Sequence, residues 1–356
     1  MRLIVTGACG FVGSSIIQAL LESTTNLEIY GLDSLIRAGS ELNRSKLKNL
    51  GVKLLHGDIR SATDVAELPP AKWIIDAAAN PSVLAGVDGK TSSRQVIEHN
   101  LFGTVNLLEY CKKHNAGFIL LSTSRVYSIK PLAELSVDAK DNAYHPKAYS
   151  NEAGFSRKGV SEEFSTIPPL SLYGTTKLAS EQLALEYSEA FDFPVWINRC
   201  GVFAGAGQFG RPDQGIFSFW INSYLRRRPL KYIGFGGTGY QVRDCLHPRD
   251  LVPVLLQQFS NESSGKQTIQ NISGGVANSI SLAQLTHWCE SRLGFHHPVG
   301  RETQVRPFDI PWMVLDSSLA CKQWNWQPVM NLDDIFEDIL QHAEKHEKWL
   351  ELSSDG

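Results

Sequence analysis

The chain lacks three features that would point to other classes of protein. Its six cysteines include no C-x-x-C pair, so neither a zinc site nor a disulfide framework is indicated. It has no excess of positive charge: the formal net charge is -3, which argues against a nucleic-acid partner. It has no apolar run near the roughly 20 residues that span a membrane. We therefore expect a cytoplasmic protein with no metal site and no membrane or nucleic-acid partner.

The composition and the hydrophobic pattern indicate a globular α/β protein. Hydrophobic residues make up 42% of the 356 positions, enough for a large core. Short apolar runs alternate with helical patterns, and this alternation predicts a parallel sheet with helices on both faces. The predicted strands are Leu3–Val5, Leu27–Leu32, Val52–His56, Trp73–Ile75, Phe118–Leu121 and Val195–Asn198. The predicted helices between them are Val12–Leu21, Val96–Lys113 and Thr175–Ala190. The apolar start of the chain is broken at Thr6-Gly7, which favours a buried strand over a signal peptide.

The pattern changes near residue 200, after which Gly-rich turns separate short strands and helices such as Leu282–Leu293 and one from Leu332. We predict a doubly wound sheet domain over 1–200 and a smaller substrate-binding lobe over 201–356, parts of which can return to the sheet. Segment 129–171 is long, aperiodic and rich in Pro, Ser and Asn. Loops of that length are usually functional or disordered, so we expect an insertion near the active site.

A glycine pattern follows the first predicted strand directly. The sequence T-G-A-C-G-F-V-G places Gly7, Gly10 and Gly13 in a turn that opens a helix at Phe11 and Val12. Glycine permits a tight turn and a close approach to a pyrophosphate, whose charge the helix N-terminus favours. The pattern therefore predicts a dinucleotide site in a Rossmann-type sheet.

An acidic residue stands at the end of the second predicted strand. Asp33 follows Gly13 by 20 residues, the place from which a carboxylate binds ribose hydroxyls and repels a 2′-phosphate. We therefore predict NAD rather than NADP, although Arg37 could accept a 2′-phosphate. An aspartate that caps the next turn is the alternative interpretation.

Further cofactor contacts are predicted where the next two strands end. Asp58, beside Ile59, could face the adenine, and a surface turn is the alternative. The small residues Ala77, Ala78 and Ala79 follow the fourth strand, where they would let the dinucleotide lie close. Packing between helix and sheet is their alternative explanation.

A candidate acid–base pair lies at the start of the Thr175–Ala190 helical pattern. Tyr173 and Lys177 occur as Y-G-T-T-K, and their spacing puts both side chains on one helix face. An ammonium and a nicotinamide cation nearby would lower the pKa of the phenol, which is about 10 when free. Tyr173 could then take a proton from a substrate hydroxyl while hydride leaves for the nicotinamide. The run Ser122-Thr123-Ser124 ends a strand and offers a hydroxyl to the same substrate oxygen.

Several motifs occur in the order seen in extended short-chain dehydrogenases, the NAD-dependent epimerase/dehydratase family, which the chain resembles over nearly its whole length. These motifs are T-G-x-x-G-x-x-G, Asp33, A-A-A-N, Asn100 with Gly103-Thr104, S-T-S-R-V-Y and Y-G-x-x-K. Two stretches look more narrowly like the CDP-tyvelose (CDP-paratose) 2-epimerases. They are S-E-E-F-S-T-x-x-P-x-S-L-Y-G-x-T-K-L-A-S-E and N-R-C-G-V-F-A-G-A-G-Q-F-G.

This resemblance implies a tightly held NAD, a CDP-linked hexose as substrate, and inversion at C2 through a transient ketone. By motif position it implies that Thr123 is the catalytic hydroxyl, Tyr173 the base and Lys177 its partner. It further implies that Asn100 supports the cofactor site, that Ser122 contacts the cofactor, and that the protein forms a homodimer or homotetramer.

The resemblance also implies a set of substrate contacts at Ser124, Arg125, Gln208, Arg243 and Arg306. Arg243, in V-R-D, and Arg306, in R-P-F-D, match positions that clamp the pyrophosphate, which suits the planar guanidinium group. Surface salt bridges are the alternative interpretation for both.

The sequence departs from the wider family at several points, so alternatives stay open. Asp76 stands where His is common, Ser128 where Gly is usual, and Val202 where many relatives carry a phosphate-binding Asn. Related 4,6-dehydratases carry T-D-E where this chain has T-S-R at 123–125, and elimination without those acids lacks its proton carriers. A dehydratase, an epimerase of UDP- or GDP-linked sugars acting at C4, and a non-catalytic NAD-binding sensor are the alternatives.

Overall fold

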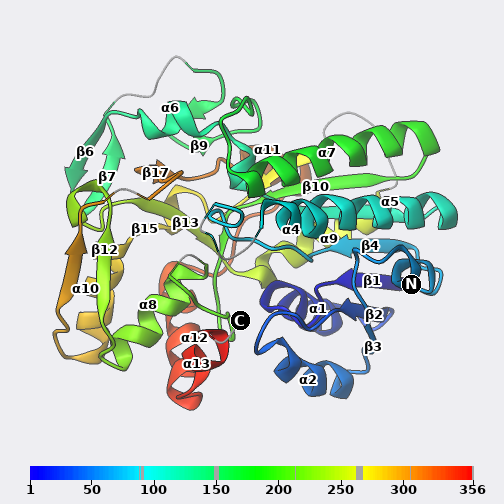
Figure 1. Ribbon diagram of the computed structural model, residues 1–356, viewed down its shortest axis with the longest axis horizontal. Helices are drawn as coiled ribbons and strands as arrows, with labels where there is room; N and C mark the ends of the chain where they lie inside the picture. Colours follow the sequence, from blue (N-terminus) through cyan, green and yellow to red (C-terminus); the bar gives the residue numbers. More distant parts are fainter. Residues whose placement is uncertain are drawn as a thin grey trace.

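The structure is a computed structural model that describes residues 1–354 except 88, 90–91, 148–151, 213, 262–267 and 305. A large sheet with helices on both faces lies on one side of the molecule, and a smaller lobe lies on the other (Figure 1). Within the described part of the chain, no helix combines the length and apolar composition of a membrane span.

The central sheet has seven parallel strands in the order β14-β10-β5-β4-β1-β2-β3. All six predicted strands are confirmed. The sheet strands are β1 Arg2–Thr6, β2 Glu28–Asp33, β3 Lys53–His56, β4 Trp73–Asp76, β5 Gly117–Thr123, β10 Val195–Cys200 and β14 Ile269–Ile272. Central strands such as β10 are buried at every residue, which is why they read as unbroken apolar runs.

Helices cover both faces of this sheet because successive strand residues point to opposite sides. In β1, Leu3 and Val5 pack into the core under one set of helices, and Ile4 packs into the core under the other. The first set consists of α1 Phe11–Ser23, α2 Asn43–Asn49, α9 Val252–Ser260 and α11 Ser318–Trp324. The second set consists of α3 Ala62–Ala66, α5 Gly103–His114 and α7 Leu172–Phe191. The predicted doubly wound Rossmann-type fold is confirmed.

The helix predicted over Val96–Lys113 is interrupted. It comprises α4 Ser93–Ile97, a π-helical turn η2 at Glu98–Phe102, and α5. The π turn contains Asn100, whose side chain is buried and bonded to neighbouring elements, as described below. Such turns inside α-helices are frequent at functional sites.

The smaller lobe is built around three helices, α8 Ile216–Leu225, α10 Leu282–Leu293 and α12 Leu332–Lys345, followed by α13 Trp349–Ser354. The expected helices at 282–293 and from Leu332 are confirmed. Its strands are β11 Val202–Phe203, β13 Val242–Leu246, β15 Ser279–Ser281 and β17 Trp312–Met313 in one sheet, and β12 Leu230–Ile233 with β16 Val299–Glu302 in another. The short 3-10 turns of the chain are η1 Ser40–Leu42, η3 Ser124–Val126, η4 Phe235–Gly237, η5 Pro248–Leu251 and η6 Val276–Asn278.

The chain crosses between the two parts more than once, because β14, α9 and α11 come from beyond residue 200 but pack with the large sheet. The division into 1–200 and 201–356 stays a prediction.

The described residues of segment 129–171, which exclude 148–151, are folded, contrary to the loop-like composition of the segment. It holds α6 Ile129–Ala133, a hairpin of β6 Val137–Lys140 and β7 Ala143–Pro146, and a hairpin of β8 Phe155–Ser156 and β9 Gly159–Val160. Asp141 and Asn142 turn the first hairpin with φ of 51° and 59°, the conformation that tight hairpins require. The segment also contacts the smaller lobe, where Ser281 Oγ donates to Asn142 O at 2.6 Å. Elements this short leave no periodic pattern in a sequence.

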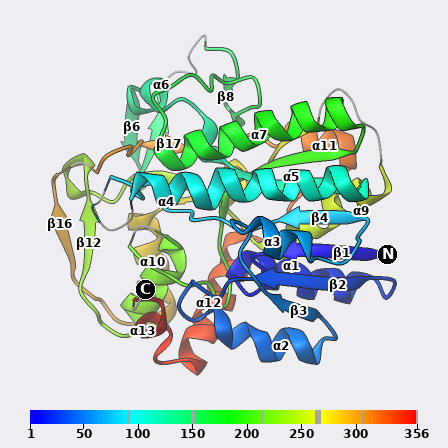
Figure 2. The same ribbon diagram turned by 45° about the vertical axis from the view of Figure 1, so that its right-hand side comes forward.

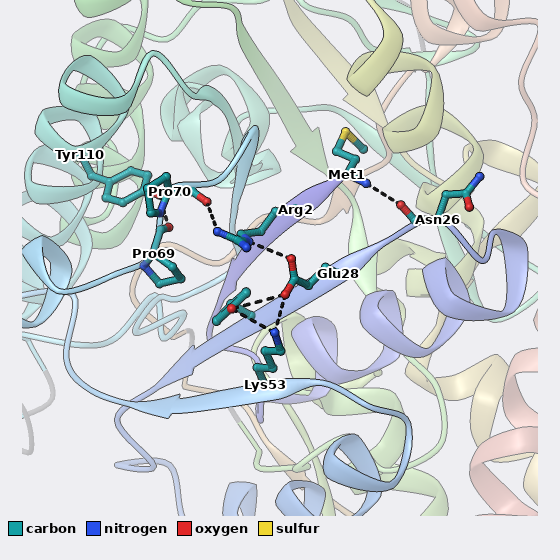
Figure 3. Close-up of polar contacts among 9 residues, drawn as sticks. Met1, Arg2, Asn26, Glu28, Lys53, Pro69, Pro70 and Tyr110 are labelled. Atoms are coloured by element: carbon teal, nitrogen blue, oxygen red, sulfur yellow. Dashed lines mark hydrogen bonds and ion pairs between the residues drawn. The ribbon is translucent and has the colours of Figure 1, made fainter.

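Polar contacts link neighbouring residues at the end of the sheet where the strands begin (Figure 3). Arg2 donates to Glu28 at 2.9 Å, and Lys53 pairs with the same carboxylate. Tyr110 OH donates to Pro69 O at 2.6 Å. Exposed ion pairs of this kind contribute little to stability. The candidate site lies at the opposite end of the sheet, where the strands end.

Candidate active site

The glycine turn lies between β1 and α1, next to the place where the order of the parallel strands reverses. In open α/β sheets ligands bind at this switch point, beyond the carboxyl ends of the strands. Gly7 has φ of +60°, and a Cβ there would lie 2.9 Å from Ala77 O. A Cβ on Gly13 would lie 2.2 Å from Gly7 O. Close packing therefore requires both glycines.

The first turn of α1 is suited to an anion. Gly10 is the N-cap and supplies no side-chain cap, and the first turn contains no acidic residue. The N–H groups that open a helix have no partner within it, and the helix dipole favours negative charge at this end. Phe11 and Val12 begin the helix, so the predicted pyrophosphate-binding residues form a cradle that fits the group.

Asp33 ends β2 at the same edge of the sheet. Its two carboxylate oxygens accept backbone hydrogen bonds from Cys9 and Leu35, each at 2.8 Å, which fixes the orientation of the carboxylate. Arg37, the candidate acceptor of a 2′-phosphate, instead donates to Phe209 O at 2.9 Å and bonds the side chain of Gln214. The guanidinium group is thus engaged by a distant loop.

Asp58 and Ile59 lie beyond the end of β3. Asp58 pairs with Arg60 at 2.6 Å, and this hydrogen bond lowers the pKa of the Asp58 carboxyl. Ile59 packs against α5, where a Cβ on Gly103 would lie 2.4 Å from Ile59 Cδ1. Asp58 and Arg60 also line an open cavity of about 440 Å³ beside Phe102.

The alanines after β4 continue into a loop that Asn100 holds in place. Asn100 accepts from Asn80 N at 2.8 Å and donates to Asn80 O at 3.1 Å and to Thr176 of α7 at 3.2 Å. The loop that contains Ala77–Ala79 is therefore linked through Asn100 to α7. Asp76, at the family's usual His position, is buried and accepts from Thr6 Oγ1 at 2.7 Å.

The structure brings Thr123, Tyr173 and Lys177 together. Thr123 ends β5, and Tyr173 and Lys177 lie one turn apart on α7, which begins beside it. A hydrogen bond joins the side chains of Thr123 and Tyr173. Gly174 permits this approach, because a Cβ there would lie 2.2 Å from Arg125 O.

Burial dominates the electrostatics of this pair. It raises the pKa of Tyr173 to about 12, against the lowering effects of the Thr123 hydrogen bond and the nearby Arg125. Burial lowers the pKa of Lys177, which the charges of Asp76 and Glu181 partly offset. The expectation that an ammonium and a nicotinamide cation together lower the pKa of Tyr173 stays a prediction, because NAD is part of it. The positive side chain that acts on the phenol is Arg125.

A buried ion pair behind the site was not predicted from the sequence. Arg199 Nη2 lies 2.7 Å from Glu181 Oε2, and the two side chains are 5% and 1% exposed. Ser122 Oγ donates to Glu181, and Arg199 donates to Tyr127 OH at 3.2 Å. The Ser122 hydroxyl is thus engaged in this network. The cofactor contact that the resemblance implies for Ser122 stays a prediction. Glu181 lies one turn after Lys177, but nothing in the sequence marks Arg199 as its partner.

Two of the predicted substrate residues, Arg125 and Arg243, converge on one carboxylate. Arg243 pairs with Asp309 at 3.0 Å, and its side chain is only 16% exposed, so it is no surface salt bridge. Arg125 follows Ser124 in η3 and donates to Phe308 O at 3.4 Å. Burial and the neighbouring Arg243 lower the pKa of Arg125 to about 10, although Asp309 opposes this effect. The charge of Asp309 acts on both guanidinium groups, and the charge of Asp244 also acts on Arg243.

The other two predicted substrate residues are placed differently. Arg306 donates to Pro212 O at 3.0 Å at the surface. Gln208 is buried and donates to Phe203 O at 2.7 Å, while its side-chain oxygen has no partner among the described residues. Gln208 lies in the chain that follows β11, whereas Arg306 lies between β16 and β17 and contacts that chain at Pro212.

Two departures from the family pattern have a structural setting. The Ser128 hydroxyl bonds Ser165 Oγ at 2.9 Å and Ile167 O at 2.6 Å. These bonds hold the end of segment 129–171 against the residue that precedes its start. Val202 begins β11, and its N–H donates to Asp244 at 3.2 Å.

Comparison with known proteins identifies the family. Residues 3–273 match the model of the NAD dependent epimerase/dehydratase family, and the chain belongs to that family. It is 28% identical over 351 residues to the CDP-paratose 2-epimerase of Salmonella typhi, covering 94% of this chain and 96% of that protein. It is 25% identical over 352 residues to UDP-glucuronate 4-epimerase 4 of Arabidopsis thaliana, covering 93% and 72%.

Solved structures extend the likeness to the whole fold. The UDP-glucuronic acid 4-epimerase of Bacillus cereus, solved with UDP-glucuronic acid and NAD, is 26% identical and superposes with a TM-score of 0.77. The match covers 97% of this chain and 99% of that one. The predicted family and its NAD cofactor are confirmed.

Proposed function

We propose that this protein is a nucleotide-sugar epimerase that inverts C2 of a CDP-linked hexose through a transient ketone. The observation that carries the proposal is that Thr123 at the end of β5 lies beside the start of α7, which holds Tyr173 and Lys177. These residues lie at the same end of the sheet as the glycine turn, and no acidic residue stands at 124 or 125. The similarity to a CDP-paratose 2-epimerase over almost the full length of both chains supports the C2 assignment.

The cofactor would be held by residues at the carboxyl ends of β1 to β4. We assign the pyrophosphate to the turn from Gly7 to Gly13, the adenosine ribose to Asp33, and the adenine to Asp58 and Ile59. Ala77–Ala79 would lie along the dinucleotide, and Asn100 would hold their loop in place. When bound, NAD supplies a hydride acceptor and then a hydride donor.

The chain's own groups would handle the proton. Tyr173 takes the proton of the sugar hydroxyl and returns it after the ketone has turned, and Thr123 hydrogen-bonds the same oxygen. Burial holds Tyr173 protonated, so a positive charge beside it is needed to make it a base. Arg125 supplies such a charge within the protein, and we assign Lys177, one turn along the same helix, as the partner of Tyr173. Ser124 would line the sugar, and Arg243 and Arg306 would clamp the diphosphate.

A 4,6-dehydratase is the main rival, because a probable dTDP-glucose 4,6-dehydratase from Sinorhizobium fredii is also 28% identical, over 293 residues. Elimination of water requires an acid and a base beside the threonine. Ser124 and Arg125 occupy those places here, so the site favours epimerisation.

Incubation of the purified protein with CDP-paratose, UDP-glucuronic acid and dTDP-glucose tests the proposal. We expect the CDP-sugar to be converted to a new isomer of the same mass, which chromatography and mass spectrometry detect. The Tyr173→Phe variant should give no conversion. A product lighter by one water would identify a dehydratase. Conversion of the UDP-sugar alone would move the reaction to C4, and the absence of any conversion would favour a sensor.

We also propose that the protein is a cytoplasmic homo-oligomer, a dimer or tetramer. Light scattering of the purified protein tests the assembly, and a monomer at micromolar concentration would contradict it.

A further inference from the structure

The chain after β11 contacts both the cofactor cradle and the C-terminal helix. We call residues 204–212, with the sequence A-G-A-G-Q-F-G-R-P, the clasp loop. Most of it lies within one of the two stretches that resemble the 2-epimerases. The reaction proposed above gives it no role, and the resemblance implies only a substrate contact at Gln208.

Phe209 of the clasp loop contacts the start of α1 and the segment that follows Asp33. It belongs to a buried cluster with Phe11, the first residue of α1. Its ring fills the space beside Gly39, where a Cβ would lie 2.6 Å from Phe209 Cε1. Its carbonyl accepts from Arg37 at 2.9 Å. The loop thus runs from the pyrophosphate turn to the segment just after Asp33.

Trp349 holds the clasp loop from its other side. Its ring stacks on Phe209 with centroids 5.2 Å apart and planes at 14°, and its indole N–H donates to Gln208 O at 2.9 Å. Trp349 is 6% exposed and Phe209 is 4% exposed, so the two rings exclude water from each other.

The segment that carries Trp349 is itself anchored to the smaller lobe. Arg226, just after α8, donates to Glu347 O at 2.8 Å and to His346 O at 3.3 Å. Arg228 pairs with Glu351 at 2.8 Å. Figures 1 and 2 show α12 and α13, in red, between the smaller lobe and the α1–α2 side of the sheet domain. The C-terminal segment therefore bridges the two parts at the cofactor end.

We propose that Phe209 and Trp349 are positioning residues that retain NAD, which leaves its site only when the C-terminal segment lifts from the clasp loop. The inference rests on the proposed epimerase reaction, in which each turnover restores the cofactor, so that release serves no purpose. A dehydrogenase must exchange its cofactor in every cycle and would gain nothing from such a closure.

Exchange of bound NAD for isotopically labelled NAD in the holoenzyme tests the proposal. After mixing and rapid desalting, mass spectrometry gives the labelled fraction against time. Trp349→Ala removes a stacked ring and an indole hydrogen bond, and we expect exchange to be about 10-fold faster or more. Trp349→Phe keeps an aromatic ring and should give an intermediate rate.

Trp288→Ala is the matched control. Trp288 also combines a ring contact, with Phe336 at 5.4 Å, and an indole hydrogen bond, to Asp333 at 2.9 Å, but it lies on α10. Trp349 has further ring contacts with His342 and His346. Its removal should leave the exchange rate unchanged.

The proposal is overturned if folded Trp349→Ala exchanges NAD at the wild-type rate, or if Trp288→Ala accelerates exchange equally. Should Trp349→Ala fail to fold, Trp349→Phe and Phe209→Leu decide the question by the same measurement, and unchanged exchange in both overturns it. Exchange is measured without any sugar. Failure of the epimerase assignment therefore shows separately, as absence of turnover.

Discussion

Gly174→Ala should disable the site by adding one methyl group at a residue that does not touch the substrate. The new Cβ would lie 2.2 Å from Arg125 O, whereas real Cβ atoms essentially never come closer than 3.0 Å, so the backbone must give by at least 0.8 Å. The clash is with backbone rather than with a flexible side chain, so either the start of α7 or η3 moves. Tyr173 lies at the start of α7, and Thr123 directly precedes η3.

A displacement of about 1 Å at reacting groups can cost on the order of 10²-fold in rate, and overpacking costs about 1–3 kcal/mol of unfolding free energy. We therefore expect turnover of the CDP-sugar to fall about 100-fold, while the protein stays folded and keeps its NAD. Turnover is measured by chromatography of the isomers, and unfolding by urea titration.

Gly300→Ala is the control, because a Cβ there first meets the flexible side chain of Lys231 at 3.2 Å, far from the site in the β12–β16 sheet. It should leave turnover unchanged. Near-normal turnover by folded Gly174→Ala would refute the reasoning, since it would show that the contact between η3 and α7 does not set the position of Tyr173.

Three further substitutions test other parts of the account. Tyr173→Phe removes only a hydroxyl, so the fold and bound NAD should persist while turnover falls by roughly 10²–10⁴; a folded variant with near-normal turnover would remove Tyr173 from the mechanism. Asp33→Ala should weaken NAD binding and relax discrimination against NADP in titrations, and an unchanged preference would show that another group reads the ribose. Arg199→Ala leaves Glu181 buried without its partner and should cost about 3–5 kcal/mol of unfolding free energy in urea; a loss below about 1 kcal/mol would contradict the role given to this pair.

The fold of the sheet domain could be predicted because its signals are local. Buried parallel strands read as apolar runs, and the glycine turn, Asp33 and the Tyr173–Lys177 spacing each depend on neighbours in sequence. The strand β14 could not be found in this way. Its sequence I-Q-N-I is half polar, and Gln270 and Asn271 are fully buried because distant groups satisfy them. Among these groups are the side chain of Gln323 and the carbonyl of Val160.

The parts of the site that escaped prediction depend on partners far apart in the chain. Arg125 and Arg243 were predicted, but their common neighbour Asp309, on a third segment, was not. Phe209 and Trp349, which stack on each other, are 140 residues apart. Burial raises the pKa of Tyr173, and the Y-x-x-x-K spacing gives no sign of this, because the extent of desolvation depends on tertiary packing. Sequence spacing identifies which groups take part, whereas their charge states depend on the fold.

The central claim is that hydride leaves C2 of a CDP-hexose and returns to the same carbon without leaving the site. The most direct test is conversion of CDP-paratose deuterated at C2, followed by mass spectrometry of the product. The account predicts that the isomer keeps its deuterium, that no added NAD is consumed, and that unlabelled substrate takes up no deuterium from heavy water. Loss of the label to water would show that the carbon is deprotonated instead, and it would contradict the account.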